Sequence, residues 1–181
     1  MTQQPSLETS RLLLRPFTLA DASDVLRLAG ERALAATTLN IPHPYEAGMA
    51  EEWIGGHEAA FLEGSDVTFA ITLRDSLELI GAIGLGIAAQ HARAEIGYWI
   101  SVPHWSHGYC TEAARAVVDY GFREPGMNRI FAMHFARNPA SGRVMQKIGM
   151  TREGCLRQHI LKWGAYEDVV EYGILRSEWS R

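Results

Sequence analysis

The stretch that decides the fold is WSHGYCTEAARAVVDYGF, from Trp105 to Phe122. A loop of aromatic and turn-forming residues passes through Gly108 directly into an amphipathic helix. One face of this helix is apolar at the spacing of helical turns, and its members are Ala114, Val117, Val118, Gly121 and Phe122. Charged side chains occupy the opposite face. The stretch therefore predicts a helix that packs one side on a sheet.

The start of this helix is a candidate anion site. The N–H groups of a first helical turn have no partner inside the helix, and the helix dipole adds positive potential there. Phosphate and pyrophosphate groups suit such a position. Gly108 lets a ligand approach the backbone without meeting a Cβ atom. An ordinary strand-to-helix turn has the same residue types, so both interpretations stay open at this point.

The flanking sequence predicts a mixed α/β domain. Strand-like runs are expected at 11–15, 67–73, 79–87, 95–101, 129–135, 155–163 and 168–175, and further helices at 18–30, 47–62 and 138–149. We expect a largely antiparallel central sheet of about seven strands, with about four helices on its faces. The strand–helix–strand unit from Glu95 to Phe135 predicts one local parallel pair. A single domain over residues 1–181 is the simplest organisation.

Two local features refine this expectation. Thr18 and Asp21 have the spacing of a capping box at the start of the first helix. The run Gly81-Ala-Ile-Gly-Leu-Gly86 lacks the Lys-Ser/Thr of a phosphate loop and lies within a strand pattern. We interpret it as a bent strand that a neighbouring strand approaches closely.

Composition excludes several function classes. The 181 residues carry a formal net charge of −4, without a basic tail that would hold nucleic acid or an anionic membrane. No apolar run reaches the roughly 18 residues that span a bilayer, and the polar N-terminus has no hydrophobic signal segment. Two cysteines, Cys110 and Cys155, do not form a disulfide framework. The sequence therefore predicts a cytoplasmic protein.

Four stretches in order resemble the GNAT superfamily of N-acetyltransferases, and within it the RimJ/RimL branch that acetylates the N-termini of ribosomal proteins. They are LETSRLLLRPF near the N-terminus, AEIGYWIS, the motif Trp-x-x-Gly-Tyr-x-Thr-Glu-Ala at Trp105, and NPASGRVMQKIGM. Each motif alone is weak, but the set is specific and spans roughly Leu7 to Trp179. The resemblance implies the GNAT fold, acetyl-CoA as co-substrate, and direct transfer to a primary amine in a ternary complex.

The resemblance also implies a set of acetyl-CoA contacts. The backbone at the helix start would hold the pyrophosphate, through His107, Gly108, Tyr109, Cys110, Thr111 and Glu112. The strand before the loop would offer its backbone to the pantetheine arm, through Trp99, Ile100 and Val102, with Ile100 nearest the thioester. Asn138 resembles a pantetheine contact and is also the N-cap expected before Pro139. Lys147 either reaches a CoA phosphate or is a solvated helix lysine.

For catalysis, the family position of a general base falls on Glu95, which often acts through water in relatives. A carboxylate half-buried beside Ile96 and Tyr98 has the raised pKa that a base needs. The alternative is a structural ion pair or strand cap. Many members carry a tyrosine acid where this chain has Met145. The branch has Ser at position 141 instead, so Ser141 is the candidate hydrogen-bond partner of the CoA sulfur.

The acceptor is less specified. The segment Asn40 to Tyr45 lies where a variable helical part of the family flanks the acceptor cleft, so His43 and Tyr45 are candidate substrate contacts; a tight proline loop is the alternative. The acceptor is a protein N-terminal α-amine or a small amine such as an antibiotic. A non-catalytic acyl-CoA-binding module is the rival class.

Two further expectations concern metal and assembly. His104 and His107 have the spacing of metal ligands, but no third and fourth ligand stands at a useful distance, so we expect no metal. Family members commonly self-associate, and the closing strands could pair between subunits. A homodimer is therefore expected.

Overall fold

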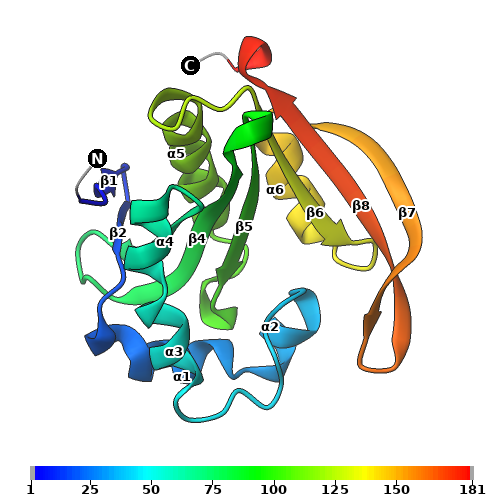
Figure 1. Cartoon of the computed structure of the whole chain (residues 1–181). Coiled ribbons are helices and arrows are strands. Elements are labelled where there is room, and N and C mark those ends of the chain that lie inside the picture. Colours follow the sequence, from blue (N-terminus) through cyan, green and yellow to red (C-terminus); the bar gives the residue numbers. More distant parts are fainter. Residues whose placement is uncertain (1–2, 180–181) are drawn as a thin grey trace.

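The computed structural model describes residues 3–179, and its centre is one eight-stranded sheet (Figure 1). The strand order is β1-β2-β3-β4-β5-β6-β8-β7, and every neighbouring pair is antiparallel except β5 and β6. The strands are β1 (Leu7–Glu8), β2 (Leu12–Pro16), β3 (Asp66–Leu73), β4 (Leu79–Ala88), β5 (Arg93–Ile100), β6 (Arg129–Phe135), β7 (Thr151–Lys162) and β8 (Ala165–Leu175). The mixed, largely antiparallel fold and its one parallel pair are confirmed.

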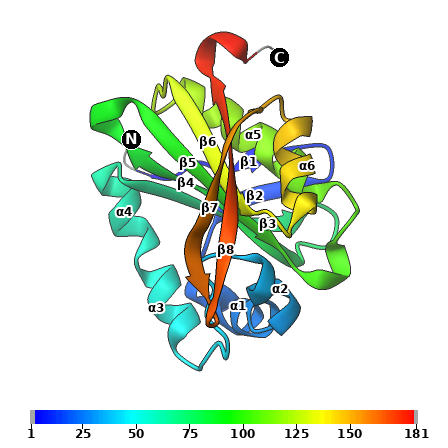
Figure 2. The same cartoon turned by 90° about the vertical axis from the view of Figure 1, so that its right-hand side faces the viewer.

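Helices cover both faces of the sheet. They are α1 (Ala22–Ala29), α2 (Arg32–Thr37), α3 (Met49–Gly55), α4 (His57–Glu63), α5 (Tyr109–Arg123) and α6 (Pro139–Lys147). Figure 2 shows α5 and α6 on one face and α3 and α4 on the other, with α1 and α2 at one end of the sheet. The larger apolar core lies beneath α5, and a second core lies beneath α1 and α3.

The elements differ from the sequence-based expectation mainly in three places, and β7 and β8 also begin a few residues earlier than expected. The helix expected at 47–62 is two helices, α3 and α4, that meet at Gly55 and Gly56. Two adjacent glycines weaken a helix because each costs about 1 kcal/mol relative to alanine. Neither β1 nor α2 was expected, since two strand residues and a six-residue helix are too short to show a period.

The glycine-rich strand β4 packs as expected from its sequence. A Cβ atom on Gly81 would lie 2.3 Å from the carbonyl oxygen of Trp99 in β5. One on Gly84 would lie 2.7 Å from the carbonyl oxygen of Val67 in β3. These glycines therefore permit the close approach of the two neighbouring strands, as predicted.

Asp21 confirms the capping interaction predicted at the first helix. Its Oδ2 accepts hydrogen bonds from the backbone N–H of Thr18 at 2.8 Å and from the Thr18 hydroxyl at 3.1 Å. These contacts close a short 3₁₀ turn (Leu19–Asp21) that leads into α1. Arg15 in β2 forms an ion pair with the same carboxylate at 2.7 Å. The cap therefore ties the first helix to the sheet.

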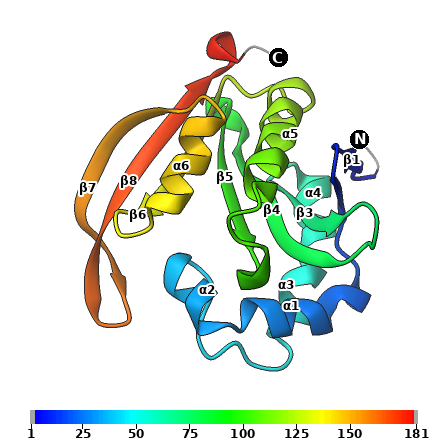
Figure 3. The same cartoon turned by 180° about the vertical axis from the view of Figure 1, so that it is seen from behind.

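The tip of the β7–β8 hairpin projects past the end of β6 (Figure 3), and it contacts the loop after α2 through Lys162. The strands join at Trp163 and Gly164, whose φ values of 51° and 80° both lie in the left-handed region, as a tight hairpin turn requires. Lys162 Nζ donates to the carbonyl oxygens of Leu39 at 3.2 Å and Ile41 at 3.0 Å. These hydrogen bonds therefore attach the hairpin tip to the segment between α2 and α3.

Candidate active site

The centre of the candidate site is a fork between β5 and β6. These parallel strands pair only at Arg93–Arg129, Ala94–Ile130 and Glu95–Phe131. Beyond that point β5 continues to Ile100 paired with β4 alone, while β6 continues paired with β8. The β5 edge from residue 96 onward has no β6 partner, and its backbone groups are available to a ligand.

The direction of the free backbone groups follows from the β4–β5 ladder. Ser101 N–H donates to the Ile80 carbonyl at 2.8 Å, so alternate residues of β5 turn toward β4. Ile96, Tyr98 and Ile100 consequently turn their N–H and C=O groups toward the fork. The indole of Trp105 donates to the Ile100 carbonyl at 2.6 Å. The N–H of Ile100 is therefore the donor left at the open end of the fork.

One of the expected pantetheine contacts turns its backbone away from the fork. Trp99 is paired with Ala82, and the alternation of the ladder turns its backbone groups toward β4 rather than toward the fork. Its side chain packs in the second core, against which Val102 also packs. Of the β5 residues named from the sequence, Ile100 presents its backbone to the fork and Trp99 does not.

The loop before α5 has the geometry of an anion seat. Ser106 and Gly108 both have left-handed backbones, with φ of 65° and 81°. The N–H of Glu112 donates to the Gly108 carbonyl at 3.1 Å, which is the first α-helical bond of α5. The N–H groups of Tyr109, Cys110 and Thr111 precede that bond and have no acceptor inside the helix. Glu112 N–H is thus committed to the helix.

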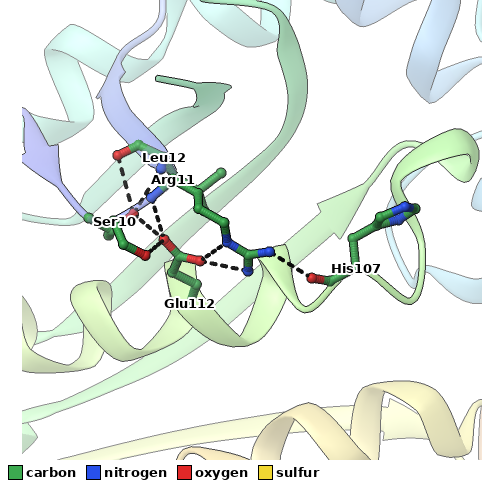
Figure 4. Close-up of polar contacts among 6 residues, drawn as sticks. Ser10, Arg11, Leu12, His107 and Glu112 are labelled. Atoms are coloured by element: carbon green, nitrogen blue, oxygen red, sulfur yellow. Dashed lines mark hydrogen bonds and ion pairs between the residues drawn. The ribbon is translucent and has the colours of Figure 1, made fainter. Parts of the chain in front are cut away.

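The side chain of Glu112 holds the N-terminal segment against this loop (Figure 4). Its Oε1 accepts from the hydroxyls of Thr9 at 2.7 Å and Ser10 at 2.9 Å, and from the Arg11 N–H at 2.8 Å. Its Oε2 is paired with the Arg11 guanidinium at 2.7 Å. Partial burial alone would raise the pKa of Glu112, but the hydrogen bonds from Thr9, Arg11 and Ser10 lower it to about 2.

A groove of about 620 Å³ runs beside the loop and is lined by both basic and acidic side chains. Its lining includes Arg11, Gly108, Thr111, Arg115 and Lys147. Arg115 Nη2 donates to the Lys147 carbonyl at 2.9 Å, which fixes α5 against the end of α6. Two cationic side chains from different helices therefore line the groove that starts at the free N–H groups of α5.

Ser141 lies on the other side of the fork, in the first turn of α6. Its Oγ is 2.9 Å from the hydroxyl of Tyr98, a side chain of the unpaired part of β5. Asn138 is the N-cap of α6 and accepts from the Ser141 N–H at 3.4 Å, which confirms its capping role. Burial, and then the nearby Cys110 thiol, raise the pKa of Tyr98. Strand β5 and helices α5 and α6 therefore converge on one small polar cluster.

A comparison with protein families agrees with this geometry. The model of the acetyltransferase (GNAT) domain family matches residues 11–151. The chain belongs to the GNAT acetyltransferase family. An uncharacterized N-acetyltransferase of Bacillus subtilis, YoaA, is 36% identical over 95% of this chain and 97% of its own length. A ribosomal-protein-serine acetyltransferase of Escherichia coli is 33% identical over 52% of this chain and 54% of its own.

A solved structure shows the same fold. RimL, described as a ribosomal L7/L12 alpha-N-protein acetyltransferase in complex with coenzyme A, superposes with a TM-score of 0.87. The match covers 94% of this chain and 98% of that chain at 20% sequence identity. At this identity the structure shows a shared fold, and the Escherichia coli relative supports the RimJ/RimL-like branch for this acetyltransferase.

In this acetyltransferase, Glu95 lies at the closed end of the fork. It is the last β5 residue paired with β6, and it lines a cavity of about 390 Å³ together with Gly86, Arg93 and Phe131. Burial, and then the charge of Glu171, raise the pKa of its carboxyl. In an extended strand Glu95 and Ile100 are roughly 16 Å apart. The structure therefore does not bring Glu95 directly beside the Ile100 N–H.

His43 and Tyr45 have different surroundings in the loop between α2 and α3. The His43 ring faces the Trp163 ring of the hairpin tip, with centroids 6.1 Å apart. Tyr45 packs against the second core, and burial raises its pKa. His43 thus lies beside the bridge between the loop and the hairpin, whereas Tyr45 mainly anchors the loop to the core.

Sequence reasoning missed two residues of the site, Tyr98 and Arg11. Tyr98 stands within the motif AEIGYWIS, where its alternation with Ile96 and Ile100 is a usable signal for a side chain on the same face. Nothing local marks Arg11, because its partners Glu112 and His107 lie about a hundred positions along the chain.

Residues 3–179 hold neither a metal-binding cluster nor a membrane-spanning helix. Within that range no three His, Cys, Asp or Glu side chains gather in an arrangement that could hold a metal ion. His104 Nδ1 instead bonds the Ser101 hydroxyl at 2.9 Å. No helix in the same range is long and apolar enough to cross a membrane.

Proposed function

We propose that this GNAT enzyme uses acetyl-CoA and transfers the acetyl group directly to a primary amine in a ternary complex. The observation that carries the proposal is the early end of the β5–β6 pairing beside the unbonded N–H groups of α5. A pyrophosphate needs backbone donors and nearby cations, and an extended pantetheine arm needs an unpaired strand edge. Both features occur on one side of the sheet.

The fit of coenzyme A follows from these groups. The N–H groups of Tyr109, Cys110 and Thr111 would hold the pyrophosphate, and the left-handed Gly108 leaves the approach open. Arg115 and Lys147 line the adjoining groove and would face its phosphates. The pantetheine arm would lie along residues 96–100 of β5, with Asn138 at its far side.

Acetyl transfer involves three changes that the site must support. The incoming amine attacks the thioester carbonyl, the C–S bond breaks, and the amine gives up a proton. Ile100 N–H is the donor for the oxyanion that develops on the carbonyl. Ser141 Oγ would hydrogen-bond the departing sulfur, and a thiol pKa of about 8.5 makes the thiolate a tolerable leaving group.

Glu95 remains our proposal for the base. Its raised pKa, caused by burial and Glu171, suits a group that must accept a proton near neutral pH. Its place at the closed end of the fork means that the amine proton reaches it through water. Because Glu95 and Ile100 are roughly 16 Å apart along the strand, a chain of several ordered waters would carry the proton from the amine to Glu95.

For the acceptor we propose a protein N-terminal α-amine, on the strength of the ribosomal-protein acetyltransferases among the relatives. A small cationic amine is the second candidate, since the carboxylate of Glu95 lines the cavity at the closed end of the fork. A regulatory module without turnover is less well supported, because the Ser141–Tyr98 pair lies beside the fork. A cytoplasmic location and a homodimer stay predictions.

Calorimetric titration with acetyl-CoA tests the proposal. The wild type is expected to bind in the micromolar range, and Gly108→Asp to lose binding because it puts a carboxylate at the pyrophosphate seat. Gly126→Asp is the matched control, since Gly126 also has a positive φ, of 68°, and a Cβ there meets nothing within 4 Å. Failure of the folded wild type to bind acetyl-CoA would overturn the proposal.

A panel of N-terminal peptides and small amines, with acetyl-CoA as donor, then identifies the acceptor. Acetylation of peptides over small amines supports the protein acceptor, and the reverse supports the small amine. Binding without turnover across the whole panel would favour the regulatory module.

A further inference from the structure

The guanidinium of Arg11 lies against the loop that precedes α5 and is not part of that loop. Its Nη1 donates to the His107 carbonyl at 3.1 Å, and its Cζ lies 4.6 Å from the centre of the Tyr109 ring. Its Nη2 is 3.6 Å from the position that a Cβ of Gly108 would occupy. Arg11 therefore contacts His107 in the loop, as Figure 4 shows, and Tyr109 at the helix start, and it lies beside Gly108 between them.

Glu112 fixes Arg11 in that position. The carboxylate binds the guanidinium through Oε2 and the Arg11 backbone N–H through Oε1. An arginine held by two groups of one partner has a defined orientation, because the guanidinium is planar and its donors form a rigid fork. Only 16% of the Glu112 side chain is exposed, against 48% of the Arg11 side chain, so the carboxylate is the buried anchor.

The backbone of the loop before α5 is unfavourable by itself, and the contact with Arg11 stabilises it. Ser106 has φ of 65°, a left-handed backbone that is unfavourable for a residue other than glycine. The contact to His107 turns one loop carbonyl toward Arg11, and the His107 ring stacks on the Tyr109 ring at 5.7 Å. The carbonyl oxygen of His107 is thereby occupied by a cation. The N–H groups that follow it remain free.

Charge leads to the same conclusion. An unpaired carboxylate in the first turn of α5 would repel a pyrophosphate at the helix start. The ion pair with Arg11 cancels this charge where the anion would sit. Glu112 therefore helps an anion site only as long as Arg11 is bound to it.

We propose that Arg11 and Glu112 act as one unit that positions the pyrophosphate loop, so that the N-terminal segment 9–11 is a working part of the acetyl-CoA site. This inference rests on the proposed function of the same site. Arg11 is a positioning residue here: it acts through the loop backbone and does not need to touch the ligand.

Calorimetric titration of acetyl-CoA and of dephospho-CoA tests the inference. Dephospho-CoA keeps the pyrophosphate and lacks the 3′-phosphate. Arg11→Gln and Glu112→Gln should each weaken the binding of both ligands by about tenfold or more, which is the loss expected for a charged hydrogen-bond pair. The double variant should bind both ligands as tightly as the single variant with the lower affinity, because the two residues act as a unit.

Two further variants separate a positioning role from a general effect of positive charge. Arg11→Lys keeps the charge but cannot bind Glu112 and His107 together, so it should behave like Arg11→Gln. Arg74→Gln is the matched control. Arg74 holds the same segment, through the Thr9 carbonyl at 3.0 Å and Glu8 at 3.7 Å, and it lies outside the lining of the groove. This variant should bind both ligands like the wild type.

Several results would overturn the inference. They are unchanged or tighter binding by Glu112→Gln, wild-type affinity in Arg11→Lys, and a loss limited to acetyl-CoA, which would make Arg11 a direct 3′-phosphate contact. Thermal unfolding of each variant shows whether it is folded. Absence of wild-type binding to either ligand would instead be a failure of the proposed function.

Discussion

The hydroxyl of Tyr98 lies 2.9 Å from Oγ of Ser141, and this contact joins strand β5 to the first turn of α6 across the fork. The same hydroxyl is 3.3 Å from the Ser141 carbonyl oxygen. Tyr98 is partly buried against the larger core, and both polar contacts of its hydroxyl are to Ser141. The contact therefore restricts the rotamer of the serine that we propose beside the CoA sulfur.

Tyr98→Phe should lower kcat by about fivefold while leaving the affinity for acetyl-CoA unchanged, because one net hydrogen bond of about 1 kcal/mol orients Ser141. Ser141→Ala should give a similar loss, and the double variant should add little to it. Tyr120→Phe is the control, a buried tyrosine that packs on Phe69 at 5.8 Å. Steady-state kinetics together with calorimetry measure both quantities. Equal losses of kcat and affinity would contradict a positioning role.

Glu95→Gln should lower kcat/KM by about a hundredfold or more, the usual contribution of a general base. Activity of the wild type should rise with pH as Glu95 loses its proton, and this rise should lie above the ordinary range of a glutamate because its pKa is raised. The rise should be absent in the variant. Glu171→Gln should move the rise to lower pH, since the Glu171 charge helps to raise the pKa of Glu95. An identical pH profile in Glu95→Gln would exclude Glu95 as the base.

His57 should make stability depend on pH in a defined window. Its ring packs between Trp53 and Phe17, and burial lowers its pKa from 6.5 to about 4. Between these two values the unfolded chain binds a proton at His57 that the folded chain excludes. Stability should therefore fall as the pH falls through this window.

The variant His57→Leu should lose that part of the pH dependence. Thermal midpoints at pH 7 and about pH 4.5, inside the window in which only the unfolded chain binds the proton, measure the effect. The carboxylates common to both proteins give the background. The same fall in midpoint for variant and wild type would show that His57 does not exclude the proton.

Gly81→Ala should destabilise the protein by about 1–3 kcal/mol, the usual cost of overpacking. The new Cβ would lie 2.3 Å from the Trp99 carbonyl oxygen, a backbone atom that moves only with β5. Gly97→Ala is the matched control, because Gly97 is also a strand glycine and a Cβ there meets nothing within 4 Å. Urea unfolding of both variants measures the difference. Equal stability of the two would mean that β4 and β5 can separate without cost.

Much of the fold follows from local patterns in the sequence. The period of apolar residues in 114–122 predicts α5 and its buried face, and Gly108 marks its start. The unit from Glu95 to Phe135 predicts the parallel pair, and Gly164 the hairpin turn. Local patterns fail where elements are short or interrupted, as at α2 and at the glycines between α3 and α4.

By itself, the sequence determined the mixed sheet, the helix start at Gly108 and the family motifs, because these depend on residues close together in the chain. Only the tertiary structure decided where β5 and β6 separate, that Glu112 faces Arg11, and that Tyr98 meets Ser141. The physical reason is that such contacts depend on strand register and helix packing. One step along a strand reverses the direction of a side chain, and no local pattern records which distant residue will then lie opposite it.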